Sequence, residues 1–268
     1  MNKFNVSVVL PIKSSVVKDF DVYFEKAITS LKTQIVGINE LVIVHTNETQ
    51  LLEKLESFDF GDLNVVKVLF EGTPSFQAQI NLGIEKSTGD WVSIFEFDDE
   101  YSSIWFKNVK KYVDAYGDEV DAYLPIVVDV DNKGVFAGFT NEATFAAAFA
   151  MEVGYLTNDM LHDYQNFQSS GMVVRRERLM ECGLFKESFK LTFVYELLLR
   201  LTYNSLKIMT IPKIGYKHQN MREGSIFWNY KFGDDRVTDE EVQFWLSAAK
   251  KEYFFKNDRN LKFEPKNA

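Results

Sequence analysis

Short apolar runs alternate with amphipathic stretches along the first hundred residues of the chain. The runs are rich in β-branched and aromatic residues and stop at proline, polar or acidic positions, which is typical of buried strands. Because strands that alternate with helices need crossover connections, we predict an α/β fold with a mostly parallel central sheet flanked by helices. The predicted strands are 6–12, 40–45, 64–70 and 91–97, and the predicted helices are 20–33, 50–57 and 76–87.

The second half of the chain is less regular. Its predicted strands are 121–130, 171–175 and 207–211, the last closed by Pro212, and its predicted helices are 103–116, 177–182, 193–206 and 238–255. The segment 140–151, rich in alanine and phenylalanine, fits a helix or a packed loop, and the pattern does not decide between them. We expect 158–170 to be irregular and the last dozen residues to form a mobile tail.

The stretch from Gly89 to Glu100 combines a turn, an apolar run and a cluster of acids. Unpaired carboxylates resist desolvation, so this strand must leave the core and deliver them to a surface or cleft. Glu96 and Asp98 point to one side of a strand, and Asp99 joins them if the chain turns after Asp98. Such a cluster suits a hard divalent cation shared with a substrate diphosphate, although an ordinary acidic turn has the same composition.

The predicted topology places this acidic cluster beside other strand ends. In open parallel sheets, ligands bind beyond the carboxyl ends of the strands. This rule puts residues 12–15, 45–47 and 96–100 along one edge, which favours a binding site over a solvated turn.

Composition limits the class of protein. The chain has 268 residues, 46% of them hydrophobic, which is enough for one large α/β domain or two small ones. Its single cysteine, Cys182, excludes an internal disulfide or a cysteine-based zinc site. We expect no membrane-spanning helix and no signal peptide, and therefore a cytoplasmic protein. The net charge of -9 argues against nucleic-acid binding, although basic residues gather at 175–190 and near the C-terminus.

Four groups of segments, in order, resemble the family 2 glycosyltransferases, which have the GT-A nucleotide-diphosphosugar fold. They are 8–11; 81–84 with 88–92 and 96–99; 171–176 with 182–187 and 196–200; and 208–212 with 215–218. The segment 222–225 looks similar to glycosyltransferases encoded by T4-like phages. The resemblance implies a GT-A domain over 1–230, with a nucleotide-sugar half (1–100) and an acceptor half (101–230), followed by a C-terminal helix and tail (231–268).

The resembled family implies an inverting hexosyl- or pentosyltransferase that moves a sugar from a nucleotide diphosphate to an acceptor hydroxyl, with uridine diphosphate (UDP) the commonest nucleotide. Mn²⁺ or Mg²⁺ would assist the leaving diphosphate. The implied metal ligands are Glu96, Asp98, Asp99 and His218. The implied donor-binding residues are Pro11, Lys13, His45, Asn47, Asn81 and Arg222. His45 and His218 also fit ordinary structural roles.

The general base is harder to place, because Phe193 and Val194 stand where the family's acceptor helix usually has Glu-Asp. Glu196 is the first candidate, although an i, i+4 ion pair with Arg200 explains it equally well. Asp163 is the reserve candidate.

Two other functions remain open at this point. One is a phage enzyme that glycosylates hydroxymethylated cytosine in DNA, for which the basic cluster at 175–190 would supply a channel. The other is a catalytically degenerate binding module, because Glu96 replaces the usual first aspartate and His45-Thr46 replaces an acidic pair. A nucleotidyltransferase is disfavoured, because residues 11–15 lack a glycine-rich phosphate loop. The acceptor would thus be a glycan or modified DNA, and the oligomeric state is not predicted.

Overall fold

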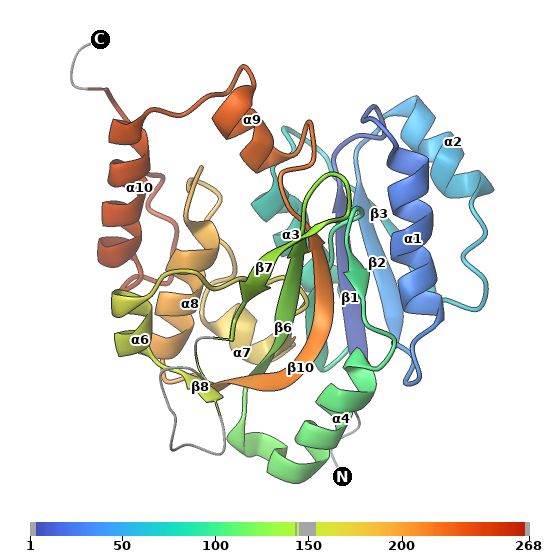
Figure 1. Ribbon diagram of the computed structural model, residues 1–268, viewed down its shortest axis with the longest axis horizontal. Helices are drawn as coiled ribbons and strands as arrows, with labels where there is room; N and C mark the ends of the chain where they lie inside the picture. The colour runs from blue at the N-terminus through green and yellow to red at the C-terminus, as the bar shows by residue number, and fades with distance from the viewer. Residues whose placement is uncertain (1–3, 143, 145–153, 266–268) are drawn as a thin grey trace.

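The computed structural model describes residues 4–142, 144 and 154–265 as a single mixed sheet covered by helices on both faces (Figure 1). The strands are β1 (Val6–Ile12), β2 (Glu40–His45), β3 (Val65–Leu69), β4 (Trp91–Ile94), β5 (Glu100–Tyr101), β6 (Ala122–Val130), β7 (Phe136–Thr140), β8 (Gly154–Leu156), β9 (Val173–Arg175) and β10 (Ile208–Gln219). The helices are α1 (Phe20–Lys32), α2 (Thr49–Ser57), α3 (Phe76–Lys86), α4 (Trp105–Tyr116), α6 (Asn158–Asp163), α7 (Arg176–Glu181), α8 (Phe193–Tyr203), α9 (Ile226–Phe232) and α10 (Asp239–Glu252), with a 3-10 turn at Gly117–Glu119.

The strand order is β3-β2-β1-β4-β9-β6-β10-β5, with β7 beside β6 and β8 beside β10. The predicted α/β class is confirmed, and β1 pairs in parallel with β2 and β4. The sheet is mixed beyond β4, because β9 runs antiparallel to both β4 and β6. Pairing of β5 with β10 is also antiparallel.

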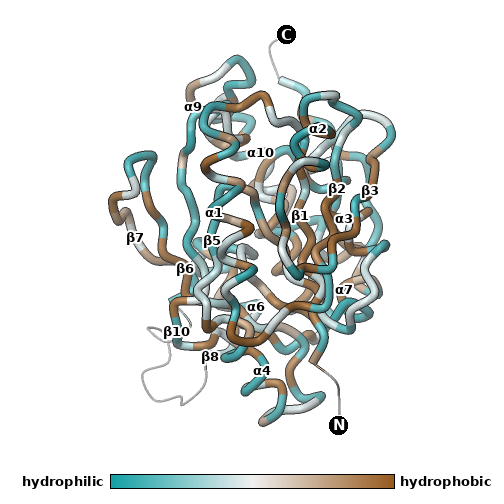
Figure 2. The backbone as a smooth tube through the Cα atoms, turned by 90° about the vertical axis from the view of Figure 1, so that its right-hand side faces the viewer, coloured by the Kyte–Doolittle hydropathy of each residue, from teal (hydrophilic) through white to brown (hydrophobic). Residues whose placement is uncertain are grey.

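Alternation along the central strands divides the core into two layers. Val8 and Leu10 of β1 pack with α1, α2 and α4, whereas Val9 faces α3, α7, α8 and α10. Helix α3 lies so close to the sheet that a Cβ on Gly83 would come 2.3 Å from Val9 Cγ1. Figure 2 shows apolar residues concentrated on these inner strands, while β7 projects from one side of the molecule. None of the described helices combines the length and apolar character that a bilayer span requires.

The structure corrects several predicted boundaries. Strand β4 ends at Ile94 and not at Phe97, because the chain turns to enter β5. Strand β10 continues through Pro212, which lies in an irregularity where the register with β6 shifts and no donor is required. The first part of 158–170 is helical, as α6. Most of the undecided segment 140–151 lies outside the described residues.

The expected mobile tail is also wrong for the described part of the C-terminus. Leu261 and Phe263 pack against the core beside α10, and the Phe263 ring lies 5.4 Å from that of Phe244. Asp258 accepts hydrogen bonds from the backbone N–H and hydroxyl of Ser188. Apolar burial and these hydrogen bonds therefore fix the segment that follows α10. The predicted domain division at residue 230 stays a prediction.

A buried carboxylate joins the amino end of β2 to its neighbours. Glu40 Oε1 accepts hydrogen bonds from Ser7 Oγ at 2.6 Å, Thr88 N at 2.6 Å and Thr88 Oγ1 at 2.9 Å. Burial alone would raise the pKa of Glu40, but these hydrogen bonds hold the pKa below its usual value. The stabilisation is therefore complete above the unfolded pKa and is lost as pH falls through the folded pKa.

We predict that Glu40→Gln lowers the free energy of unfolding by about 1.5–3 kcal/mol at pH 7, because hydrogen bonds to a charged acceptor are lost. Denaturant unfolding at pH 7, 5 and 3 measures the difference, which should shrink as the wild-type carboxylate becomes protonated. Glu53→Gln, at an exposed position of α2, is the matched control. An equal difference at every pH would contradict the assignment.

Candidate functional site

A cavity of about 570 Å³ lies at the carboxyl ends of β1, β2 and β3. Lys13 and Asn47 line it, as predicted for donor-binding residues, together with Leu69, Phe70 and Pro74. Thr46 Oγ1 donates a 2.8 Å hydrogen bond to the Lys13 carbonyl, which ties the loop after β2 to the loop after β1. The cavity thus has two charged residues, Lys13 and Glu71, beside an apolar wall, and it lies at the carboxyl ends of the strands, where such sheets bind ligands.

The side chains of Gln79 and Glu48 form hydrogen bonds that fix the ends of β1 and β2 and the loops that follow them. Gln79 Nε2, buried on α3, donates to the carbonyls of Ile12 at 3.1 Å and Val44 at 3.0 Å. Glu48 accepts hydrogen bonds from the hydroxyl and backbone N–H of Ser15. The rim is therefore fixed by buried polar contacts as well as by the sheet.

Two other predicted donor residues lie in the strands that lead to this cavity. Pro11 and His45 are buried near the ends of β1 and β2, one register step apart. His45 Nδ1 lies 3.0 Å from the Thr46 carbonyl oxygen, within the protein. Both residues are buried in the strands beneath the cavity. Contact of either residue with a sugar donor stays a prediction.

The acidic cluster forms a turn between β4 and β5 that faces the end of β10. Pairing of Glu100 with Lys217 brings Asp99 beside His218 and Gln219. Asp99 Oδ1 accepts a 2.8 Å hydrogen bond from Gln219 N, while Asp99 Oδ2 has no partner among the described atoms. The structure therefore brings Glu96, Asp98, Asp99 and His218 together, as predicted.

Arg222 closes the same cluster from the segment after β10. Its Nε donates to Asp98 Oδ2 at 2.5 Å, and both side chains are 8% exposed. The guanidinium also lies over the Phe97 ring, 4.8 Å from its centroid, and 6.0 Å from the Tyr23 ring. Residues that are distant in sequence thus place a guanidinium on the acidic turn.

The electrostatics of the turn show an excess of negative charge. Burial, and then the neighbouring Asp98, raises the pKa of Glu96 to about 7. Burial and the nearby acids also raise the pKa of Asp99 well above its usual value. Burial would lower the pKa of His218, but Asp99, Asp129 and Glu96 together raise it to about 10. An external cation would relieve this accumulation of carboxylates.

The residues of the turn fit a divalent cation by charge and donor type. Asp99 Oδ2 is a buried carboxylate oxygen without a protein partner, and Glu96 and Asp98 belong to the same turn. Within the described part of the chain, no group of three or more His, Cys, Asp or Glu side chains is arranged so that it could hold a metal ion by itself. A closed protein cage is not needed, because Mg²⁺ commonly takes one or two carboxylates and completes its shell with substrate phosphates and water.

Glu196 is a structural residue in this fold. It is fully buried on α8, with its carboxylate 2.9 Å from both Lys186 Nζ and Arg200 Nε. Arg200 also donates to the Cys182 and Leu184 carbonyls. A carboxylate enclosed by two cations cannot reach an acceptor hydroxyl, so the ion-pair alternative for Glu196 replaces its assignment as the base.

Asn81 and Asp163 are also separated from the acidic turn. Asn81 Nδ2 donates to the Phe185 carbonyl at 2.8 Å, and Asn81 Oδ1 accepts from Phe185 N at 2.9 Å, so this side chain joins α3 to the loop before α8. Because its amide is hydrogen-bonded to the Phe185 backbone, Asn81 has a structural role in place of the predicted contact with the sugar donor. Asp163 is exposed at the end of α6, which packs on α8 on the left of Figure 1.

Sequence inspection missed Asp129, which lies in β6 directly across from His218 of β10. Asp129 Oδ1 is 2.7 Å from His218 Nδ1, and the residue is 6% exposed. The sequence did contain one indication of this residue. Asp129 is an acid inside the apolar run of the predicted strand 121–130, and a buried carboxylate needs a partner.

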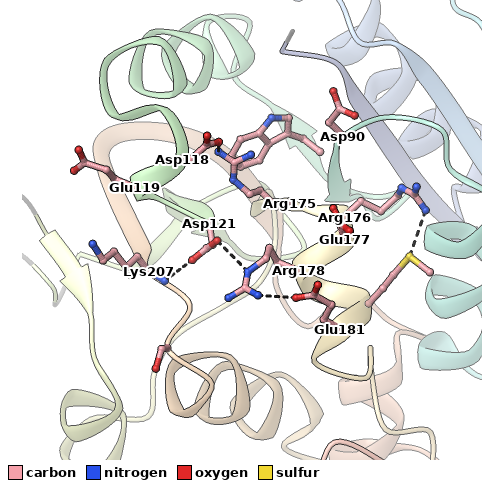
Figure 3. A pocket seen from close by; sticks show the side chains of 13 residues that line it. Asp90, Asp118, Glu119, Asp121, Arg175, Arg176, Glu177, Arg178, Glu181 and Lys207 are labelled. Carbon is pink, nitrogen blue, oxygen red and sulfur yellow. Dashed lines mark hydrogen bonds and ion pairs between the residues drawn. The ribbon is translucent and has the colours of Figure 1, made fainter. Parts of the chain in front are cut away.

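A second cavity, of about 1220 Å³, lies at the opposite edge of the sheet (Figure 3). It contains basic residues considered for a DNA channel, and acids pair with two of them, whereas Arg176 contacts the Gly89 carbonyl and the Met180 sulfur. Arg175 pairs with Asp118, and Arg178 pairs with Asp121 and Glu181. Lys186, from the same basic stretch, is buried against Glu196. These residues therefore do not form an open basic channel.

Comparison with known proteins agrees with the geometry. The family model described as glycosyl transferase family 2 matches residues 7–182. Similar solved structures include S. aureus TarS 1–349 with UDP-GlcNAc (18% identity, TM-score 0.64, 91% of this chain and 65% of that chain), the same fragment with UDP (16%, 0.61, 91% and 78%) and S. aureus TarS (17%, 0.59, 93% and 43%). This chain thus spans less than two thirds of the first and third of these.

At this level of identity the TarS structures show a shared fold, which confirms the predicted GT-A class. No curated protein matches the sequence. Neither the family match nor the TarS structures test the expected likeness to phage enzymes, which stays a prediction.

We predict that Glu196→Gln destabilises the protein by about 3–5 kcal/mol, because it leaves Lys186 and Arg200 buried without their anion. Thermal and denaturant unfolding measure the loss. Glu181→Gln, which breaks an exposed pair with Arg178, should cost less than about 1 kcal/mol. A Glu196→Gln protein that kept wild-type stability but lost sugar transfer would restore Glu196 as the base.

Proposed function

Because this chain belongs to glycosyl transferase family 2, we propose that it is an inverting hexosyl- or pentosyltransferase that uses a UDP-sugar. One observation carries the proposal: the loop cavity, and the acidic turn with Arg222, lie at the carboxyl ends of neighbouring strands of the sheet. A nucleotide sugar needs a pocket for its nucleoside and, next to that pocket, a charged site for its diphosphate. The UDP and UDP-GlcNAc complexes of TarS, which shares the fold, support uracil as the base.

The nucleoside would bind in the cavity after β1, β2 and β3. Its volume of about 570 Å³ lies within the range of small-molecule pockets. Lys13 supplies a positive charge at the rim, and Asn47 supplies an amide that can recognise a base or ribose. The hydrogen-bonded loops would hold this cavity in shape before the donor arrives.

The diphosphate would bind between the acidic turn and Arg222. A guanidinium makes paired hydrogen bonds to phosphate, and Arg222 already lies at the turn through Asp98. We propose that Mn²⁺ or Mg²⁺ is held by Asp98 with Glu96 or Asp99, and that His218 contacts the ion or the phosphates. Bound there, the ion would neutralise charge on the departing diphosphate.

Transfer would join the acceptor oxygen to the anomeric carbon as the bond from that carbon to the diphosphate breaks. The hydroxyl proton passes to a base, which would have to lie beside the acceptor hydroxyl; Asp163, the reserve candidate from the sequence, lies away from the acidic turn and does not fill that role in this structure. We propose a glycan as the acceptor and the cytoplasm as the location. The pairing of Arg175, Arg178 and Lys186 with acids gives no support to a DNA acceptor.

A binding module is the second candidate function. The burial of Glu196 among cations favours it, because this removes the leading candidate for the base. Such a module would bind the nucleotide sugar without turnover.

We predict that UDP raises the melting temperature in the presence of Mn²⁺ and that EDTA abolishes the shift. Ligand at a hundred times its Kd adds about 2.7 kcal/mol, or roughly 5–10 °C for a chain of this size. Asp98→Ala should abolish the shift, whereas Asp90→Ala, at the opposite edge of the sheet, should retain it. ADP, CDP and GDP test the choice of base.

The outcomes separate the candidates. No shift with any nucleotide would overturn the proposed donor site. A metal-dependent shift with UDP but no turnover of any UDP-sugar would favour the binding module.

We also predict that Arg222→Lys weakens UDP binding about tenfold, because lysine keeps the charge but loses the paired geometry of guanidinium. Isothermal titration calorimetry measures the change in Kd. Arg176→Lys, in the cavity of Figure 3, is the matched control and should bind as the wild type does. Equal affinity of wild type and Arg222→Lys would remove Arg222 from the diphosphate site.

A further inference from the structure

Asp129 and His218 face each other across the pairing of β6 with β10. The parallel register places His218 directly opposite Asp129. His218 Nδ1 and Asp129 Oδ1 are 2.7 Å apart, a charge-assisted hydrogen-bond distance. Because both residues lie on paired strands, the sheet itself sets this geometry, which is more rigid than a contact between loops.

A second donor fixes the same carboxylate oxygen. Gln168 Nε2 lies 3.1 Å from Asp129 Oδ1. Gln168 is held in turn by Asn141, which accepts from Gln168 N at 2.9 Å and donates to its carbonyl at 3.1 Å. Asn141 is fully buried and donates to the Pro125 carbonyl of β6. Asp129 is therefore held from two sides and has little freedom to turn away from His218.

The contact decides which part of the imidazole is free. Asp129 engages Nδ1, so Nε2 is the ring nitrogen that remains for a ligand. Asp99 and Glu96 are the charged neighbours of His218 on the acidic turn. Gln219, the next residue of β10, binds Asp99 through its backbone N–H at 2.8 Å. The ring is thus oriented at the point where the diphosphate is proposed to bind.

We propose that Asp129 is a positioning residue for sugar transfer, which holds His218 through Nδ1 so that Nε2 serves the donor diphosphate. The proposal rests on the proposed function for its ligand. Asp129 does not touch the donor and acts only through His218. Carboxylates placed behind functional histidines in this way typically contribute 10- to 100-fold to metal affinity or activity.

The first test examines the imidazole of the ligand-free protein. The chain has only three histidines, His45, His162 and His218, so long-range ¹H–¹⁵N spectra show three ring patterns. His218→Gln assigns one of them by its loss. We expect Asp129→Asn to change the Nδ1 shift of His218 alone. Asp131→Asn, in the turn after β6, removes a nearby charge without touching His218 and should leave all three patterns unchanged.

The second test measures UDP affinity with Mn²⁺ by calorimetry. We expect Asp129→Asn to weaken binding roughly 10- to 100-fold and Gln168→Leu to weaken it less, in the same direction, while Asp131→Asn binds as the wild type does. Circular dichroism and melting curves confirm that each variant is folded.

The two proposals fail in different ways. A wild-type protein that binds no nucleotide overturns the proposed function, whatever the spectra show. A wild type that binds UDP, together with an Asp129→Asn variant that has unchanged His218 shifts or unchanged affinity, overturns the role of Asp129.

Discussion

The antiparallel pairing of β5 with β10 is the constraint on which the candidate site depends. Two β5 residues are enough to turn the chain sharply after β4 and to hold the acidic turn against β10. Strand β10 then supplies the Gln219 N–H to Asp99 and the imidazole of His218, and Arg222 follows just beyond its end. Without the pairing of β5 with β10, the buried carboxylates would lack these hydrogen-bond donors and positive charges, and the free-energy cost of burying the carboxylates would be too high.

Periodicity predicted the first half of the fold closely because β1, β2 and β4 are buried on both faces and because the strands are bounded by clear polar signals. Strands β1 and β2 match the predicted ranges 6–12 and 40–45. The prediction failed where tertiary contacts override local signals. Pro212 stops an isolated strand, yet β10 passes through it at a register shift, and the polar tail is fixed by contacts near Ser188. The local sequence does not reveal such partners, because they lie far away along the chain.

The candidate site was predictable to the extent that its residues form a local pattern. Asp98 follows an apolar run within a few positions, and Lys13 and Asn47 follow predicted strands. Asp129 is a single acid within a strand, and its partner is 89 residues away, so no spacing rule joins them. Asn81 and Glu196 were misassigned because their helical positions fit a family pattern, whereas their side chains are committed to Phe185 and to Lys186 with Arg200.

Charge balance separates the two buried ionic clusters of this chain. On α8, Glu196 is enclosed by Lys186 and Arg200, whose remaining N–H groups reach backbone carbonyls, so the cluster is complete without a ligand. Glu96, Asp98 and Asp99 of the acidic turn, with Asp129 of β6, have Arg222 and His218 as their paired cations among the described residues, and one Asp99 oxygen has no partner among the described atoms. The raised pKa of Glu96 and of Asp99 shows that protons partly relieve this set in the free protein, and a bound cation would take the place of those protons. An incomplete cluster at the ligand-binding edge of the sheet is therefore evidence for a site that its ligand completes.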